Sequence, residues 1–98
     1  MPSYLALGKY TQQGLDTMGE LGDRLAATKQ TVSDAGGRLI FFYMTFGQYD
    51  FAALTEMPDD EAAARLALSI NAQGNIRTET VRAFTEEEAI ALVSSLGD

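Results

Sequence analysis

Two apolar segments joined by a very short connection are the feature that most constrains how this chain folds. Residues 38–46, RLIFFYMTF, and residues 49–57, YDFAALTEM, are separated only by Gly47 and Gln48. Aromatic and β-branched residues favour strands, and a two-residue connection containing glycine is typical of a β-hairpin. We therefore predict an antiparallel pair of strands, the first buried on both faces, with Pro58 ending the second.

A turn centred on residues 47 and 48 fixes which residues face each other across the hairpin. The predicted pairs are Phe46 with Tyr49, Thr45 with Asp50, Met44 with Phe51, and Tyr43 with Ala52. Alternation gives one almost purely apolar face, where we expect helices to pack, made of Ile40, Phe42, Met44, Phe46, Tyr49, Phe51 and Ala53. The second face mixes apolar and polar side chains, namely Leu39, Phe41, Tyr43, Thr45, Asp50, Ala52, Leu54 and Glu56.

The rest of the chain supplies two further strands and three helices. Residues 3–10 and 76–84 have strand patterns, and residues 20–35 repeat apolar positions at spacings of three and four, as a helix does. Asp59 is the expected N-cap of a second helix that ends near Gln73. Thr85 and Glu88 form a capping box for a last helix, whose Leu92 and Leu96 we expect to face inward with Ala89 and Val93. The order β-α-β-β-α-β plus a C-terminal helix predicts one α+β domain over residues 1–98, a ferredoxin-like plait with an antiparallel sheet.

In a plait of this size the helices cover one face of the sheet. The second face is too apolar to be left in water, and exposed apolar patches usually mark an interface. We therefore predict a homodimer or a higher homo-oligomer. The dimer is expected to be a dimeric α+β barrel, in which two sheets face each other and enclose a space for a small organic ligand.

Composition excludes several classes of function. Seven basic against fourteen acidic residues give a net charge of -7, which disfavours nucleic acid and membrane surfaces as partners. The chain has no histidine and no cysteine, which rules out a histidine-ligated haem, a Ser-His triad and thiolate chemistry. We predict no cofactor and no structural metal. The N-terminal residues lack the pattern of a signal peptide, and no run approaches the roughly 20 apolar residues of a membrane span, so a cytoplasmic protein is expected.

Four motifs together resemble the GYD-domain family. They are G-x-Y-D at Gly47, Tyr49 and Asp50, E-x-P-D-D-E-A-A over residues 56–63, Q-G-N-I-R-T over residues 73–78, and R-A-F-T-E-E-E over residues 82–88. The resemblance runs from end to end. It implies a ferredoxin-like, dimeric α+β-barrel fold and no established biochemical activity. Similar dimeric barrels include cofactor-free oxygenases, haem-handling proteins and ligand binders. A shared fold is only an analogy where function is concerned.

The polar residues around the turn are the candidate site. Asp is unusual in a strand, and Asp50 is expected to point toward the second face, so it is a candidate general base or ligand contact. Tyr43 or Tyr49 is a candidate proton donor. The alternative is structural: Thr45 or backbone amides hydrogen-bond the Asp50 carboxylate, and Tyr49 packs in the sheet. Glu56 lies about 20 Å from Asp50 along an extended strand at ~3.3 Å per residue, which weakens a carboxylate dyad.

Arginines on the last strand are the candidate contacts for an anionic ligand. Arg77 and Arg82 fall on opposite faces by parity, so at most one of them enters the predicted cavity. We include Arg77, with Thr45, Asp50 and Tyr43, among the candidate ligand-binding residues.

Three functions remain open at this level. The leading hypothesis is a small dimeric ligand-binding or auxiliary protein. The second is a cofactor-independent oxygenase or isomerase that uses Asp50 with Tyr43 or Tyr49, and the third is an assembly module without a ligand. A dimer cavity of roughly 300 Å³ or more with convergent polar atoms would favour the first two.

Overall fold

A four-stranded antiparallel sheet is the frame of the protein in the computed structural model, which describes residues 1–97. Its strands are β1 (Ser3–Tyr10), β2 (Arg38–Met44), β3 (Phe51–Glu56) and β4 (Ile76–Ala83), in the order β2-β3-β1-β4. Every neighbouring pair is antiparallel. This α+β arrangement is consistent with the predicted ferredoxin-like plait.

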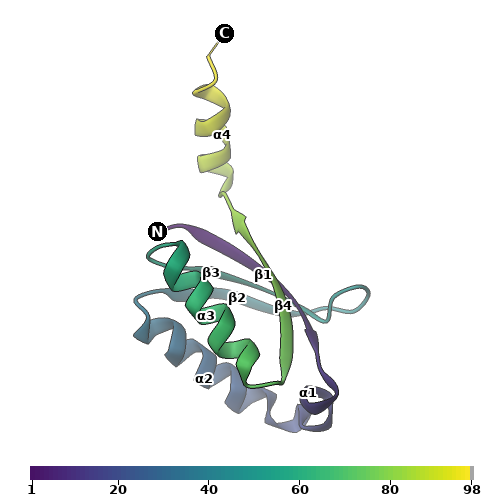
Figure 1. Ribbon diagram of the computed structural model, residues 1–98. Coiled ribbons are helices and arrows are strands. Elements are labelled where there is room, and N and C mark those ends of the chain that lie inside the picture. The colour runs from purple at the N-terminus through teal and green to yellow at the C-terminus, as the bar shows by residue number, and fades with distance from the viewer. Residues whose placement is uncertain (98) are drawn as a thin grey trace.

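Two helices cover one face of this sheet, as Figure 1 shows. They are α2 (Leu21–Asp34) and α3 (Asp60–Ala72); the short α1 (Gln12–Asp16) and a 3₁₀ turn (Met18–Glu20) connect β1 to α2, and α4 (Glu86–Ser94) follows β4. Asp59 caps α3 by accepting a hydrogen bond from the Ala62 amide, as predicted. Within residues 1–97, no helix combines the length and the apolar character that crossing a bilayer requires.

The hydrophobic core lies between the sheet and these two helices. Tyr4, Val32, Met57 and Ala63 form one buried cluster, against which Leu66 packs. Val32 and Met57 are completely buried. Fully burying a side chain of this size stabilises the folded state by about 1.5–3 kcal/mol, so these contacts hold α2 and α3 on the sheet.

The prediction that the first hairpin strand is buried on both faces is wrong for this chain. β2 is an edge strand, and Tyr43 and Met44 are 64% and 58% exposed. The expected parity also fails at the start of β2, where the register shifts between Leu39 and Phe41. Leu39 lines the space beneath the helices, whereas Ile40 is exposed. An inserted residue reverses the facing of its neighbours, and alternation alone gives no sign of it.

The hairpin connection is longer than the predicted two residues. The register Met44 with Phe51 is confirmed, but the strands stop there and residues 45–50 form a loop. Gly47 adopts a positive φ of 127°, as expected for a turn glycine. The prediction that Phe46 packs on the helix face is wrong, since its side chain is fully exposed. Within this loop the Thr45 amide still donates to the Asp50 carbonyl at 2.8 Å, which is consistent with the predicted pairing of these two residues.

The prediction that the last helix packs inward is also wrong. α4 projects from the end of β4, away from the sheet and the other helices (Figure 1). Its apolar residues Ile90 and Val93 are 61% and 67% exposed, and Leu96, just after the helix, is 81% exposed. The capping box at Thr85 and Glu88 is present with both of its hydrogen bonds, and it acts locally. It determines where the helix begins, but it does not supply a surface for the helix to pack on.

Candidate functional site

Asp50 is held by the backbone of the neighbouring strand. Its carboxylate oxygen Oδ2 accepts a hydrogen bond of 2.9 Å from the Tyr10 amide, and its own amide donates to the Gly8 carbonyl at 2.8 Å. The residue thus extends the pairing between β3 and β1 just before β3 begins. This contact is of the kind that the structural alternative expects, although the amide belongs to β1 and not to the turn.

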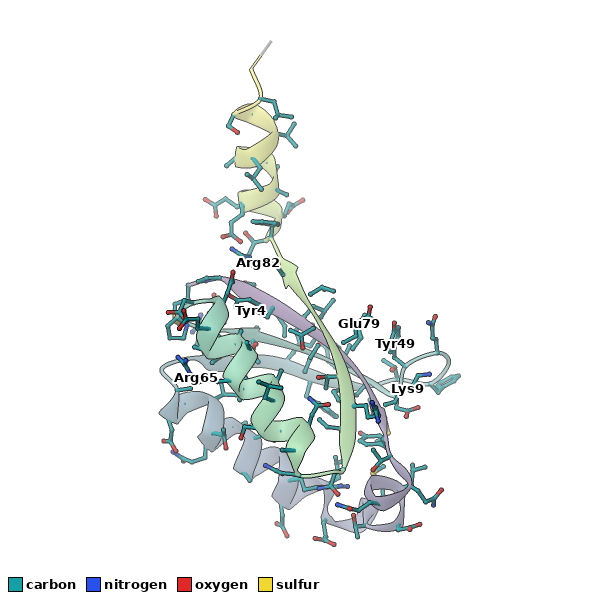
Figure 2. All side chains as sticks on the ribbon, viewed as in Figure 1. Tyr4, Lys9, Tyr49, Arg65, Glu79 and Arg82 are labelled. Atoms are coloured by element: carbon teal, nitrogen blue, oxygen red, sulfur yellow. The ribbon has the colours of Figure 1, made fainter. Side chains whose placement is uncertain are left out.

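Tyr49 forms a side-chain pair that the sequence did not indicate. Its hydroxyl donates to Oε2 of Glu79 on β4 at 2.5 Å, and Figure 2 shows the two side chains meeting beside the loop. The hydrogen bond to this carboxylate, helped by burial, raises the pKa of Tyr49 above its ordinary value of 10.0. Tyr49 is therefore a protonated hydrogen-bond donor at neutral pH, with Glu79 as its acceptor.

The remaining hairpin candidates have separate partners. The Thr45 hydroxyl donates to the Tyr49 carbonyl at 2.7 Å, and the Tyr43 ring stacks on Phe41 with 4.8 Å between ring centroids. No hydrogen bond joins the side chains of Tyr43, Tyr49 and Asp50 among the described residues. A catalytic role for these three stays a prediction, and the contacts present are those of a braced loop.

The two candidate arginines lie on opposite faces, as parity predicted. Arg77 is exposed and pairs in register with Lys9, whereas Arg82 pairs with Tyr4 on the side of the helices. The Arg82 guanidinium lies 5.7 Å from the Tyr4 ring centroid and 4.4 Å from that of Phe84. Such cation–π contacts brace the point at which β4 leaves the sheet.

The sheet surface opposite α2 and α3 carries a group of apolar side chains, and we call it the open face. Its members, taken from the strand registers, are Leu5, Leu7, Phe41, Tyr43, Ala52, Leu54 and Val81. Tyr43 and Val81 are 64% and 41% exposed, and the others are half-buried. At one end of this face Glu56 pairs with Arg38 at 2.6 Å, so Glu56 is already engaged. No helix of the described chain covers this surface (Figure 1).

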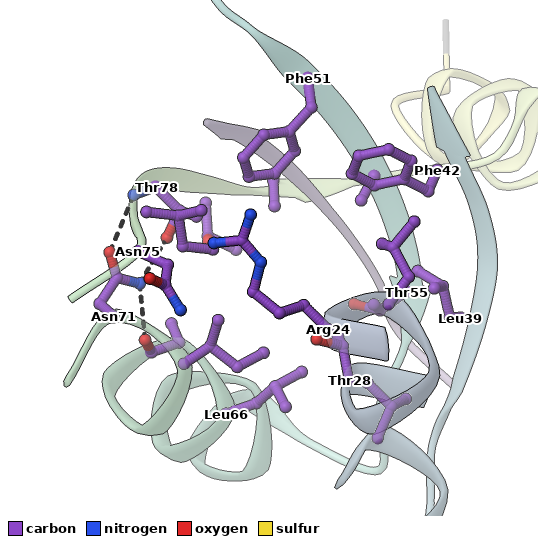
Figure 3. A pocket seen from close by; sticks show the side chains of 18 of the residues that line it. Arg24, Thr28, Leu39, Phe42, Phe51, Thr55, Leu66, Asn71, Asn75 and Thr78 are labelled. Atoms are coloured by element: carbon purple, nitrogen blue, oxygen red, sulfur yellow. Dashed lines mark hydrogen bonds between the residues drawn. The ribbon is translucent and has the colours of Figure 1, made fainter. Parts of the chain in front are cut away.

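The covered side of the sheet contains a small cavity of about 120 Å³ between α2, α3 and the strands. Its wall is mainly apolar, with Phe42, Phe51 and Leu66 among the lining residues, and Arg24 is the one charged side chain in the described lining. Figure 3 shows the Arg24 guanidinium directed into this space. Across the cavity, Asn71 donates to the Thr78 hydroxyl and accepts from the Thr78 amide, both at 2.9 Å, which ties α3 to β4.

Arg24 is not among the candidate residues predicted from the sequence. It lies three residues after Leu21 and four before Thr28, within the stripe of the helix that faces the sheet. That spacing was the available signal, but a charged residue in an apolar stripe is ordinarily assigned to solvent.

Comparisons with known proteins agree with the α+β fold described above. The family model described as GYD domain matches residues 4–93. A relative from Thermus thermophilus, described as "Glutamine synthetase and cystathionine beta-lyase binding protein", is 29% identical over 92 residues, which cover 93% of this chain and 97% of the relative. The crystal structure of the protein TTHA0845, also from Thermus thermophilus, aligns with a TM-score of 0.55 at 23% identity, covering 86% of this chain and 94% of that one. At this identity, the structural likeness supports the fold alone.

Proposed function

This chain belongs to the GYD-domain family, and we propose that it is a small auxiliary protein that self-associates and binds an enzyme. The observation that supports this most directly is the apolar surface left uncovered on two parts of the molecule, the open face and α4. A 98-residue chain that exposes Tyr43, Val81, Ile90 and Val93 has surface to bury against other molecules.

We assign the open face to a second copy of the chain. Each copy carries a net charge of -7, so two copies repel each other unless a sufficient apolar area is buried between them. The open face offers such an area, with Phe41 and Tyr43 stacked on β2 and Val81 on β4. A two-fold axis through this face makes the contact self-complementary and gives the predicted homodimer.

We assign α4 to an enzyme partner. The helix begins at its capping box and stands clear of the body. Its apolar residues at positions 89, 92 and 93 form one helical stripe, which Leu96 continues in the turn that follows. An amphipathic helix presented in this way suits a groove on another protein. The Thermus thermophilus relative is named as a binding protein for glutamine synthetase and cystathionine beta-lyase, and we extend these two enzymes to this chain as its partners.

Aspartate substitution on the open face tests the dimer. Tyr43→Asp puts a charge among the most exposed apolar side chains of the proposed contact, on its β2 edge, and is expected to convert the dimer to a monomer in light scattering at micromolar concentration. Leu68→Asp is the matched control, because Leu68 is 72% exposed on α3, away from the open face, and this variant should remain dimeric. A monomeric wild-type protein, or a Tyr43→Asp variant that stays dimeric, would contradict the assignment.

Binding to the two enzymes is tested separately on α4. The protein is immobilised, and glutamine synthetase and cystathionine beta-lyase from the organism that encodes this chain are passed over it. Binding is followed by interferometry. Val93→Asp is expected to abolish binding while leaving the dimer intact, and Leu68→Asp should bind like the wild type. If neither enzyme binds the wild-type protein, or if Val93→Asp binds unchanged, the partner assignment is wrong.

A further inference from the structure

The cavity beneath α2 and α3 is lined by a positively charged side chain, Arg24, that forms no ion pair with an acidic residue of the described chain. Within residues 1–97 the ion pairs are Arg38 with Glu56 and Arg65 with Glu61, and Arg24 belongs to neither. A buried charge is costly unless it is paired and hydrogen-bonded. The position of Arg24 in an otherwise apolar lining therefore calls for an explanation.

Only part of the Arg24 guanidinium is used within the chain. Its Nη2 atom donates to the carbonyls of Gly14 and Thr17, both at 3.2 Å, and so ties α2 to the segment around α1. Its Nε and Nη1 atoms are buried and have no hydrogen-bond partner among the described residues. Folding thus fixes the guanidinium in place and leaves donors free at the cavity.

A second buried donor lies in the same lining. The hydroxyl of Tyr10 is also buried without a partner among residues 1–97, and its ring packs against Phe51 with 5.6 Å between centroids. Burial raises the pKa of Tyr10 above 10.0, although the positive charge of Arg24 acts in the opposite direction. At neutral pH the hydroxyl is therefore protonated and can donate a hydrogen bond to an acceptor.

We propose that this cavity binds a small monocarboxylate, whose oxygens accept hydrogen bonds from Arg24 and Tyr10 and whose apolar body fills the space toward Phe51 and Leu66. A guanidinium is the side chain best suited to a carboxylate. The volume of about 120 Å³ compares with the roughly 150 Å³ of an apolar cavity that holds benzene, so the ligand has about six heavy atoms.

The lining also predicts what the cavity rejects. Its described residues include no Asp or Glu, so a ligand ammonium group would be desolvated without a counterion. We expect a plain carboxylate to bind in preference to an amino acid of the same size. The cavity lies on the side of the sheet opposite the open face, so this binding is independent of the proposed dimer and of α4.

Calorimetric titration with 2-methylpropanoate tests the site, with two probes of matched shape as controls. 2-Methylpropanamide removes the negative charge, and alanine replaces one methyl group with an ammonium group. We expect the carboxylate to bind with one site per chain, and the amide and alanine to bind at least about tenfold more weakly, as loss of a charge-assisted hydrogen bond implies. No binding of the carboxylate at millimolar concentration, or equal affinity for the amide, would overturn the proposal.

Variants of the chain locate the binding. Arg24→Gln should weaken the affinity for 2-methylpropanoate at least about tenfold. Because Arg24 also anchors Gly14 and Thr17, a second variant is needed in case Arg24→Gln does not fold. Ala67→Leu fills the cavity from α3 and keeps Arg24 itself, and it should abolish binding. Arg65→Gln removes an exposed arginine of α3 outside the cavity and should bind like the wild type. Wild-type affinity in Ala67→Leu would show that the carboxylate binds elsewhere.

Discussion

The two faces of the sheet differ in how completely this chain covers them. On the side of α2 and α3, Val32 and Met57 are fully buried, while on the open face Tyr43 and Val81 are 64% and 41% exposed. Both faces carry apolar side chains from the same strands. The difference therefore arises from the supply of covering elements and not from the strands. It shows which side of the sheet the described chain covers and which side it leaves open.

The largest expected contrast between the faces is in the cost of truncating an apolar side chain. Met57→Ala should lower the free energy of unfolding by about 2–5 kcal/mol, because it leaves a cavity in a fully buried position. Val81→Ala on the open face should cost less than about 1 kcal/mol in the isolated chain. Urea denaturation in the Tyr43→Asp background, expected to be monomeric, measures both without a contribution from association. Similar losses at the two positions would show that the open face is covered within the chain.

A glycine on the covered face gives the next contrast. A Cβ atom added at Gly8 would lie 2.0 Å from Cζ of Phe51, so Gly8→Ala forces that ring away from its packing on Phe42. We expect a loss of about 1–3 kcal/mol. Gly22→Ala is the control on α2, where an added Cβ meets no atom within 4 Å, and it should stabilise the helix by roughly 0.5–1 kcal/mol. Thermal or urea unfolding of the two variants should therefore shift in opposite directions.

α4 should respond to mutation independently of the sheet. Thr85→Ala removes the N-cap hydrogen bond to the Glu88 amide and should destabilise α4 by about 1 kcal/mol. Because α4 is not packed on the body, the unfolding midpoint of the sheet should not move. Amide hydrogen exchange followed by NMR distinguishes the two regions, with faster exchange confined to residues 86–94. Loss of protection in β1 or β3 would mean that α4 contacts the core.

The smallest expected effect is a pH dependence confined to the same helix. The hydrogen bond from the Thr85 amide lowers the pKa of Glu88 below its ordinary value of 4.5. A lowered carboxyl pKa stabilises the folded form above pH 4.5, and this contribution is lost as the pH falls through the lower folded value. NMR titration of the Glu88 side chain should show the low midpoint, and α4 helicity in Glu88→Gln should lose this acid transition. An unchanged acid transition in that variant would assign it to another carboxylate.

Most of the fold could be predicted because its signals are short-range. The bounds of β1, the Asp59 cap of α3 and the capping box of α4 each depend on residues within a few positions of one another. The hairpin register was predicted correctly at Met44 and Phe51 for the same reason. The register shift after Leu39 was not, because nothing in the alternation of residues 38–44 marks an inserted position.

The candidate site was predicted less well because its contacts join distant parts of the chain. Asp50 was identified as unusual for a strand, yet its partner is the Tyr10 amide, 40 residues away. Tyr49 meets Glu79 across 30 residues. Neither partner has a sequence signature, since strand order decides which residues become neighbours.

The sequence by itself determined the four strands and the three longer helices, the caps of α3 and α4, and the excess of apolar residues on both faces of the sheet. Those properties follow from capping, alternation and glycine placement, which act over a few residues. Only the tertiary structure decided that α4 stands free, that the open face is left uncovered and that Arg24 points inward beside a cavity. Each of these depends on which surfaces meet after the strands have paired, and a helix stripe or a strand face has the same sequence pattern whether or not anything covers it.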